Sequence, residues 1–472
     1  MHMPYDFMLT RRQAAASTAA VAASLRATSL APRSPIRPED FGARGDGVTN
    51  DTAAFAAMAA ELSRRGGGAV ELRPTTYVVG QQRPGGESGY AFEPVPVMDI
   101  RRCSKPLIIR GNGARLRCSP GLRYGTFDPA TGRSTYHPMP FVQPGGLATP
   151  YRAMIHVEGC DGPVEISDLE LDGNLRSLEL GGQYGDRGWQ IPAIGLHLLD
   201  NRGPEFVSRI FSHHHALDGI LIDGLDGRSS MSSLQLVRCE HNGRQGCSIT
   251  GGFNYSFSHC SFQSTGRAGI SSAPGAGLDI EAEGGKRIRN LHFLRCSFSN
   301  NKGPALVADS GDTESATFDS CTFIGTTSWA VWPNKPLFRF SRCTFVGAIV
   351  HAFGDDDPRR ACQFHRCAFR DDPALSPNGE VYGGDNPSRP IADLPDNKNV
   401  LFDHCDFALT HRSVLPWTTN VTIFADCTMS QRSATQSYPR GTFVGRNLIV
   451  GNVDLYSARI EGELILNGRR LS

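Results

Sequence analysis

The 472-residue chain has no run of eighteen apolar residues, no CxxC pair and no long amphipathic helical pattern after residue 65. The first absence argues against a membrane-spanning helix, which needs about 20 consecutive apolar residues. The lack of a CxxC pair removes a common sign of zinc or dithiol chemistry. The lack of a long helical pattern argues against a helical bundle. Glycine and proline are plentiful instead, at 52 and 30 residues, and they suit many short strands joined by tight turns.

An excess of either charge is also missing. Lys and Arg together number 48, and Asp and Glu together number 47. Such a chain exerts no long-range attraction on a polyanion, so we expect no nucleic-acid partner. The composition leaves the oligomeric state open.

The first 31 residues differ in character from the rest. Arg11 and Arg12 precede a weakly apolar, alanine-rich run over residues 14–25, and Ala31 offers a small residue for cleavage. This arrangement resembles a twin-arginine export signal, with an ordinary disordered or helical leader as the alternative. We therefore expect a signal peptide over residues 1–31 and a periplasmic or extracellular protein. Removing it takes away three arginines and one aspartate, which leaves a net charge near −1.

A short phrase recurs through the second half of the chain: a polar residue, a cysteine and, two residues later, usually a phenylalanine. Its cysteines are Cys239, Cys260, Cys296, Cys321, Cys343, Cys367, Cys405 and Cys427. Successive copies lie 21 to 25 residues apart, except at two longer steps. This period matches one turn of a β-solenoid and is too short for most paired-helix repeats. We expect these cysteines to stack as buried thiols. The sequence does not decide whether Cys103 and Cys118 form a disulfide.

Each coil also contains a strand of the form Gly-apolar-x-apolar. Residues 210–224 align with residues 237–251 without a gap. Alternation at period two places one set of side chains inside the coil and the other outside. Equivalent positions of neighbouring coils then lie about 4.8 Å apart. His214, in the His213–His215 triplet, falls in the inward position two residues after the cysteine slot, so we interpret it as a packed histidine rather than a metal ligand.

Residues 40–55 carry a family resemblance. The segment DFGARGDGVTNDTAAF resembles the opening of the pectate-lyase-like superfamily, which includes rhamnogalacturonases, polygalacturonases, phage tailspike depolymerases and epimerases. The resemblance implies an all-β fold, a single-stranded right-handed parallel β-helix, with a capping helix at about residues 51–65. We assign residues 32–472 to this one domain, with a C-terminal cap at about residues 440–472. Asn50 or Asp51 can cap the helix, whose Phe55, Met58 and Leu62 share one face.

In that superfamily the substrate usually lies along the sheet of the Gly-apolar-x-apolar strands. Aligning those strands predicts two outward columns: His156, His197, Leu221, Ser248, Asp279 and Leu306; and Glu158, Leu199, Asp223, Thr250, Glu281 and Ala308. The run LDIEAE at residues 278–283 predicts three carboxylates on the outer face. Like charges so close together destabilise the fold unless they pair with positive charges or take part in binding or catalysis.

The spacing of these acids suits glycosidic bond cleavage. Residues two apart on a strand are about 6.6 Å apart, near the range of roughly 6.5 to 9.5 Å for inverting glycosidases. We predict Asp223, Asp279 and Glu281 as the acid and base set of a glycoside hydrolase acting on a polysaccharide or oligosaccharide. Glu283 and Asp309 are outer candidates. A solvated acidic stripe beside Lys286 and Arg287 is the structural alternative.

Two other function classes stay open. The resemblance also implies a polysaccharide lyase or uronate C5-epimerase, with Ca²⁺ held by Asp279, Glu281 and Glu283. Its proton-abstracting base would be one of the residues in nearby turns, which are His214, His241, Arg244 and Lys286. A non-catalytic, polysaccharide-binding solenoid is the third reading. No cofactor is required by the hydrolase.

Three insertions are expected to shape the cleft, at residues 119–150, 174–194 and 371–398. Loops over a rigid scaffold often determine specificity. Tyr184 and Trp189 are the predicted stacking platform for sugar rings, or else they pin the loop to the coil. Further substrate-binding candidates on the same face are His197, His241 and Arg244.

Several motifs of better-known relatives are missing. Where polygalacturonases carry an Asn-Thr-Asp turn, this chain reads Ala216-Leu217-Asp218, and neither their Asp-Asp pair nor their Gly-His-Gly follows. The Asp-Pro-His triplet of alginate epimerases is also absent. These departures place polygalacturonase activity in doubt and indicate a different substrate.

Overall fold

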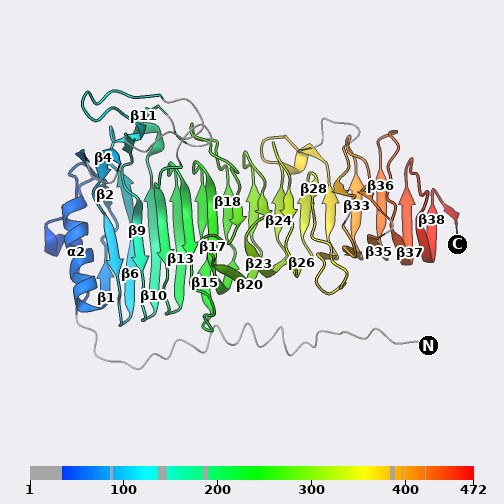
Figure 1. The fold of residues 1–472 in the computed structure, drawn as a ribbon, viewed down its shortest axis with the longest axis horizontal. Helices are drawn as coiled ribbons and strands as arrows, with labels where there is room; N and C mark the ends of the chain where they lie inside the picture. Colours follow the sequence, from blue (N-terminus) through cyan, green and yellow to red (C-terminus); the bar gives the residue numbers. More distant parts are fainter. Residues whose placement is uncertain are drawn as a thin grey trace.

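The computed structural model describes residues 34–85, 89–136, 146–182, 184, 190–382, 389–395, 397–419 and 421–471. The chain winds into an elongated stack of coils whose strands pair in parallel with the equivalent strands of the next coil (Figure 1). The predicted parallel β-helix is therefore confirmed. The expected signal peptide lies outside the described residues. No helix in the described part of the chain is long and apolar enough to cross a membrane.

One helix covers the N-terminal end of the stack, as the sequence predicts (Figure 1). It is α2 (Thr52–Arg65), and Phe55, Met58 and Leu62 on its inner face are fully buried. Asn50 supplies the first cap, because its Oδ1 accepts a hydrogen bond from the N–H of Thr52. The helix thus covers the open edge of the first coil, which would otherwise be free to pair with another chain.

Two walls run the length of the stack. The first, called wall 1 here, carries the Gly-apolar-x-apolar strands and consists of β5 (Met98–Arg101), β9 (Ala153–Glu158), β12 (Ile194–Leu199), β14 (Asp218–Asp223), the first half of β17 (Gln245–Ser258), β19 (Leu278–Ile280), β22 (Leu306–Ala308), β25 (Val331–Pro333), β28 (Ile349–Val350), β31 (Ala392–Leu394) and β34 (Trp417–Thr418).

The second wall, called wall 2, carries the cysteine phrase and bends at its corners. It consists of β1 (Gly68–Glu71), β2 (Thr76–Val79), β6 (Leu107–Cys118), β10 (Val164–Asp172), β13 (Glu205–His213), β15 (Ser232–Gln235), β16 (Arg238–Glu240), the second half of β17, β18 (Ser261–Gln263), β20 (Arg287–Leu294), β21 (Ser297–Ser299), β23 (Asp312–Asp319), β24 (Thr322–Ile324), β26 (Phe338–Ser341), β27 (Thr344–Val346), β29 (Gln363–His365), β30 (Ala368–Arg370), β32 (Leu401–Asp403), β33 (Asp406–Leu409), β35 (Ile423–Ala425), β36 (Thr428–Gln431), β37 (Thr442–Val450), β38 (Arg459–Leu466) and β39 (Arg469–Arg470).

A small separate sheet gathers parts of the N-terminal insertions beside the stack (Figure 1). Its strands are β3 (Gln82–Pro84), β4 (Tyr90–Pro94), β7 (Arg123–Thr126), β8 (Leu147–Ala148) and β11 (Glu179–Gly181). The insertions at residues 119–150 and 174–194 therefore pair with each other near the N-terminal half of the stack. Three short 3₁₀ turns complete the described elements, at Pro38–Phe41, Leu175–Ser177 and Pro373–Leu375.

Two ladders of stacked phenylalanine rings fill the coil beneath wall 2. One runs through Phe257, Phe293, Phe318, Phe340, Phe364, Phe402, Phe424 and Phe443, with neighbouring centroids 4.5 to 5.3 Å apart. The other runs through Phe262, Phe298, Phe323, Phe345, Phe369 and Phe407. Rings of the two ladders meet edge to face, a favourable arrangement for aromatic pairs.

The cysteine phrase forms a corner between these ladders. The residue before the cysteine has a left-handed backbone, as at Arg295 (φ 51°) and Arg342 (φ 54°), which turns the chain and points the thiol inward. All thirteen cysteines are free and buried. The predicted thiol stack is confirmed for the seven cysteines of the phrase from Cys260 onward, which occupy the same corner of successive coils, as when the carbonyl of Cys260 accepts from the N–H of Ser297. Cys103 and Cys118 form no disulfide, and the N–H of Cys103 donates to Sγ of Cys160 instead.

The sequence alignment is wrong by two residues at Cys239. The strand register pairs Cys239 with Phe262, so this cysteine occupies the phenylalanine position of the repeat. Val237 occupies the cysteine position, since its carbonyl accepts from the N–H of Ser261 and Leu236 supplies the left-handed corner (φ 54°). His214 consequently does not point inward. It begins the next turn, with a left-handed backbone and a half-buried ring.

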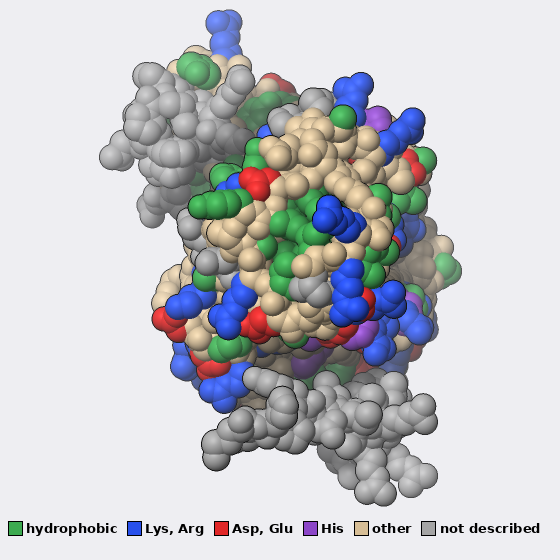
Figure 2. All heavy atoms as spheres, turned by 90° about the vertical axis from the view of Figure 1, so that its right-hand side faces the viewer, with side chains coloured by type: hydrophobic (Ala, Val, Ile, Leu, Met, Phe, Trp, Pro, Cys, Tyr) green, Lys and Arg blue, Asp and Glu red, His purple; other side chains and the backbone are tan. Residues whose placement is uncertain are grey.

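The C-terminal end of the stack is built from β37 and β38, which pair in parallel, and from β39, which pairs with β38 in antiparallel orientation. Figure 2 views the molecule from this end, where hydrophobic side chains gather at the centre and Lys and Arg surround them. Large apolar side chains left exposed in this region include Leu448, Val450 and Tyr456.

Candidate active site on wall 1

One straight column of outward residues crosses wall 1. The strand register aligns His156, His197, Leu221, Ser248, Asp279, Val307 and Trp332 on successive strands from β9 to β25. The prediction of this column is confirmed up to Asp279. Leu306 is wrong, because it pairs with the inward Leu278 and leaves Val307 as the outward residue.

The second predicted column breaks at a bulge. The pairing of β14 with β17 shifts between Ile222 and Asp223, so Asp223 lies opposite Gly251 rather than Thr250. Ala308 is fully buried, and Asp309, the next residue, lines the outer face instead. A bulge adds one residue that periodicity alone does not reveal.

The acidic run is only partly the outward stripe that alternation predicts. β19 ends at Ile280, and from there the chain leaves the ladder, with the N–H of Glu281 bonded to the carbonyl of Ile249. Asp279 faces outward but is covered by neighbours, with 5% of its surface exposed. Glu281 is half-buried and Glu283 is exposed. The three carboxyl groups therefore occupy three different environments.

A cleft of about 380 Å³ opens over this part of wall 1. It is lined by Ala273, Pro274, Asp279, Glu281, Pro304, Val307, Asp309, Ser310, Ser328, Trp329 and Trp332. Three carboxyl groups and two tryptophan side chains thus share one open cavity. A cleft that binds sugars needs polar groups such as carboxyl groups next to flat aromatic surfaces, and this cleft has both.

Asp279 is the most perturbed acid of the cleft. Burial raises the pKa of its carboxyl to about 8, the nearby Glu281 adds to the rise, and Arg244 opposes it. Oδ2 of Asp279 accepts a hydrogen bond of 2.7 Å from Nε2 of Gln245. Oε1 of Gln245 in turn accepts from the N–H of Ala276, which fixes the orientation of the amide. Because Oδ2 already accepts a hydrogen bond, the proton of Asp279 sits on Oδ1.

Glu281 is held differently. Its Oε1 accepts a hydrogen bond from the hydroxyl of Ser310, which lines the same cleft. Lys335 lies close enough to interact electrostatically with Glu281 and Asp309. Partial burial lowers the pKa of Lys335, and these two carboxylates oppose the shift. Nζ of Lys335 also donates to the carbonyl of Gly311, at 2.9 Å.

Asp223 lies outside the cleft and is engaged in an ion pair. Nζ of Lys286 is 2.5 Å from Oδ1 of Asp223 and 2.7 Å from Oδ1 of Asp200. Although burial works the other way, the two carboxylates raise the pKa of Lys286. Lys286 is therefore a charged anchor rather than a free base, and the structure does not bring Asp223 together with Asp279 and Glu281 in the cleft.

Most of the other residues predicted for this face also form ion pairs, hydrogen bonds or ring contacts within the protein. Arg244 forms a two-pronged ion pair with the fully buried Asp218 and also donates to the side chain of Gln190. His241 stacks on the ring of His214 with centroids 5.0 Å apart, next to wall 2 rather than in the cleft. Arg244 is therefore a fixed positive charge that lowers the pKa of Asp279, and it is not a free base.

His197 is half-buried beside His156, and the Nδ1 atoms of the two rings are 3.1 Å apart. Burial lowers the pKa of His197 to about 3, and His156 adds to the effect. Nε2 of His197 is buried, and the described residues provide no hydrogen-bond partner for it. His197 thus stays neutral at ordinary pH, and it lies three strands away from Asp279 in the column.

The structure shows aromatic residues that sequence reasoning missed. Trp329 and Trp332 line the cleft, whereas the ring of the predicted Tyr184 packs against the buried Tyr124. Trp189 lies outside the described residues. In the strand register Trp332 pairs with Val307, so the predicted column, which ran through Leu306, would have turned Trp332 inward. The indole Nε1 of Trp332 is buried, and no described residue accepts a hydrogen bond from it.

The carboxylates predicted to bind Ca²⁺ do not form a tight group. Sets of three ligand atoms within 4.8 Å of one another occur in the described residues at Asp172, His213 and His214, and at Asp403, His404 and Asp426. The pKa of Asp279 also means that it would have to lose a proton before it could bind an ion at neutral pH. Calcium binding on wall 1 stays a prediction.

No protein-family model matches this sequence, and no curated protein matches it. Solved structures match its fold. The A-module of the mannuronan C-5 epimerase AlgE4 from Azotobacter vinelandii is 16% identical over 91% of this chain and 96% of its own, with a TM-score of 0.43. The N-terminal fragment of gene product 12 of bacteriophage Phi29 is 12% identical over 97% of this chain and 75% of its own, with a TM-score of 0.47. A tailspike protein of the Acinetobacter baumannii bacteriophage Fri1, a capsular polysaccharide depolymerase, is 12% identical over 89% of this chain and 62% of its own, with a TM-score of 0.40.

Proposed function

We propose that this protein is an exported enzyme that hydrolyses glycosidic bonds of a polysaccharide in the cleft of wall 1. Asp279 is the general acid and Glu281 the general base. The observation that supports this assignment best is the contrast between the two carboxyl groups. One is buried and keeps its proton at neutral pH, while the other, two residues along the chain, opens into the same cleft. Two acids in environments that separate their protonation states are what glycoside hydrolysis requires.

The chemistry follows from the positions of the protons. Oδ1 of Asp279 donates its proton to the glycosidic oxygen as the bond to the anomeric carbon breaks. Glu281 accepts a proton from a water molecule that attacks the opposite face of that carbon, and Ser310 holds the carboxylate of Glu281 in place. Because the water attacks the face of the anomeric carbon opposite the leaving group, inversion is the expected outcome.

Trp332 provides a test of how the sugar is held. Replacing it by phenylalanine keeps an aromatic face but makes it smaller, and we expect KM to rise about 3- to 10-fold because part of the surface that stacks on the sugar is lost. Replacing it by alanine should raise KM further, since the whole stacking face is lost. Trp417, exposed on β34 of the same wall, is the matched control. A Trp417→Ala variant that raises KM as much as Trp332→Ala would contradict a specific role for Trp332.

A lyase or epimerase is the second candidate, and the position of Lys335 favours it. The lowered pKa of Lys335 and its proximity to Glu281 and Asp309 suit a base that removes the C5 proton of a uronate. His241 and Lys286, the bases first considered, are already engaged by other groups. In this mechanism Asp279, protonated, would neutralise the substrate carboxylate by a hydrogen bond.

One experiment separates these functions. The purified protein is incubated with a panel of bacterial and plant polysaccharides, and the products are analysed. New reducing ends without ultraviolet absorbance of an unsaturated uronate indicate hydrolysis. Reducing ends with that absorbance indicate a lyase, and a changed uronate composition without cleavage indicates an epimerase. Binding to a polysaccharide without any of these changes would overturn the proposal of an enzyme.

A further inference from the structure

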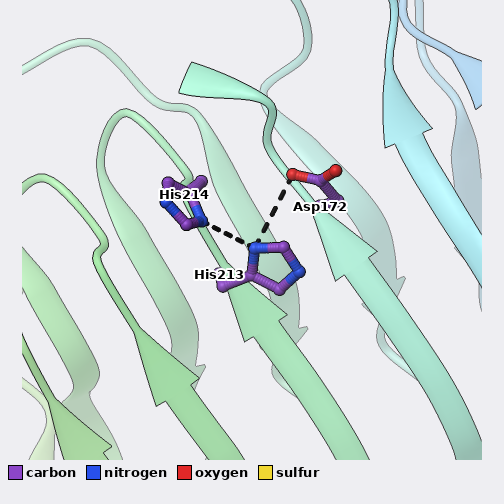
Figure 3. Close-up of side chains that lie close together, drawn as sticks. All are labelled: Asp172, His213 and His214. Carbon is purple, nitrogen blue, oxygen red and sulfur yellow. Dashed lines mark hydrogen bonds and ion pairs between the residues drawn. The ribbon is translucent and has the colours of Figure 1, made fainter. Parts of the chain in front are cut away.

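A second cluster of reactive side chains lies away from the cleft, at the ends of two strands of wall 2. Asp172 is the last residue of β10, His213 is the last residue of β13, and the two lie opposite each other in the strand register. His214 follows in a left-handed turn (φ 55°), which swings its ring back toward them (Figure 3). The side chains of Asp172 and His213 are 5% and 7% exposed.

The protonation of His213 can be worked out from its partners. Its Nε2 is 3.0 Å from Oε1 of Glu170. A carboxylate only accepts hydrogen bonds, so Nε2 carries a proton, and in the neutral imidazole Nδ1 then carries a lone pair. That lone pair faces Nδ1 of His214 at 2.7 Å and Oδ1 of Asp172 at 3.6 Å. A histidine whose outer nitrogen is held by a carboxylate is the usual arrangement around a metal ligand.

Asp172 is held from both sides and still presents an oxygen to the cluster. Its Oδ2 accepts from the guanidinium of Arg115, and its Oδ1 accepts from the N–H of Asn174 at 2.8 Å. The N–H of Asn174 uses one lone pair of Oδ1, and the other is left for a further partner. Glu170 and Asp172 supply two carboxylates next to His213, and Arg115 and Arg176 supply two guanidinium groups near the cluster, so the imidazole and carboxylate ligands carry the proposed binding rather than an excess of negative charge.

The three ligand atoms lie within 4.8 Å of one another. Bonds of about 2.0 to 2.1 Å to a tetrahedral ion place neighbouring ligand atoms roughly 3.3 Å apart. The distances of 2.7 and 3.6 Å from Nδ1 of His213 to the other two ligand atoms lie on either side of this value. The third His of the triplet takes no part, because both ring nitrogens of His215 are used, by Tyr151 and by the carbonyl of Leu171.

We propose that Asp172, His213 and His214 bind a divalent transition-metal ion of the zinc class, with water in the fourth position. Two imidazoles and one carboxylate are ligands that such ions accept. The ion joins the ends of β10 and β13, which belong to successive coils, at the point where the insertion of residues 174–194 leaves the stack. Its role is structural and independent of the chemistry on wall 1.

The test uses the full chain without an affinity tag, freed of metal by a chelator. Zn²⁺ is titrated by calorimetry and Co²⁺ by visible absorption, which reports the ligand geometry. We expect one ion per chain and a higher unfolding temperature with Zn²⁺, because an ion that binds only the folded state stabilises it. Asp172→Asn and His214→Asn should each weaken binding by at least about tenfold. Asparagine at position 214 tolerates the left-handed backbone, so this variant keeps the turn.

The matched control is His404→Asn, in the more exposed cluster of Asp403, His404 and Asp426, because position 404 has the same left-handed backbone (φ 51°). It should leave the affinity and the Co²⁺ spectrum unchanged. The proposal is overturned if no saturable binding occurs, if His214→Asn binds as tightly as the unaltered protein, or if His404→Asn abolishes binding. In the first of these cases a direct hydrogen bond between His213 and His214 would account for their short separation.

Discussion

Replacing Asp279 by asparagine is expected to lower kcat about 10²- to 10⁴-fold, with little change in KM. The amide has nearly the same shape and can still accept the hydrogen bond from Gln245, but it has no acidic proton to give to the leaving group. The rate is measured on whichever polysaccharide of the panel is cleaved. Asp393→Asn is the matched control, because burial raises the pKa of Asp393 as well, on β31 of the same wall but away from the cleft.

The same substitution should stabilise the protein at neutral pH. The pKa of Asp279 is about 8 in the folded chain and about 4 in the unfolded chain. Between these values the folded state holds a proton that the unfolded state has released, so stability falls as pH rises from about 4 to 8. Asp279→Asn removes this cost, which at 1.36 kcal/mol per pKa unit is on the order of 1 to 4 kcal/mol at pH 7.

Urea unfolding at pH 4 and pH 8 measures this difference. We expect the variant to gain stability over the unaltered protein at pH 8 and to differ little from it at pH 4. The activity of the unaltered enzyme should also decline as pH rises through about 8, when Asp279 loses its proton. Equal loss of stability at both pH values would show that position 279 is only a packing position, and the assignment of the acid would then fail.

Replacing Phe340 by alanine is expected to cost about 3 to 5 kcal/mol of stability, which is typical of deleting a buried aromatic ring. The ring is fully buried and stacks between Phe318 and Phe364, with centroids at 4.8 and 5.0 Å. It also meets the second ladder at Phe323 and Phe345. Its loss therefore leaves a cavity that interrupts both ladders at once.

Chemical denaturation followed by near-ultraviolet circular dichroism measures the effect. Phe340→Leu should recover more than half of the loss, since it refills most of the volume. Because each coil contacts only its neighbours, we expect the coils after residue 340 to unfold at lower denaturant than the coils before it. Leu294→Ala, at a surface position of β20, is the control and should change stability by less than about 0.5 kcal/mol. A comparable effect at both positions would argue against the ladders as the main source of stability.

The cysteine phrase shows how far sequence alone reaches. From Cys260 onward its period predicts the inward thiols and the inward phenylalanines, because one residue type must fill the same slot in every coil. At Cys239 the same phrase is misleading. Val237 fills the thiol slot there, and cysteine and valine are similar enough in size and polarity that the core accepts either. This error led to the wrong prediction that His214 points inward, whereas it lies in a turn.

The acids show a different limit. Alternation predicts correctly that Asp279 faces outward, but the end of β19 at Ile280 and the bulge before Asp223 depend on how neighbouring coils fit together. The cleft itself combines Asp279 with Trp332, which is 53 residues away in the sequence. The Asp172, His213 and His214 cluster likewise joins two coils, and the histidine triplet by itself indicated only packing.

The sequence by itself predicted a β-solenoid, since a repeat of 21 to 25 residues with alternating apolar positions buries one face of each strand inside a coil, and the resemblance of residues 40–55 added the parallel β-helix class and the capping helix. Only the tertiary structure decided which polar residues meet. The coils of a solenoid stack by packing side chains in the interior, and this packing sets the strand register to within a residue. The register then decides which outer side chains become neighbours, whatever their chemistry. The acid with a retained proton, the tryptophans beside it and the paired histidines therefore became visible only once the coils were in place.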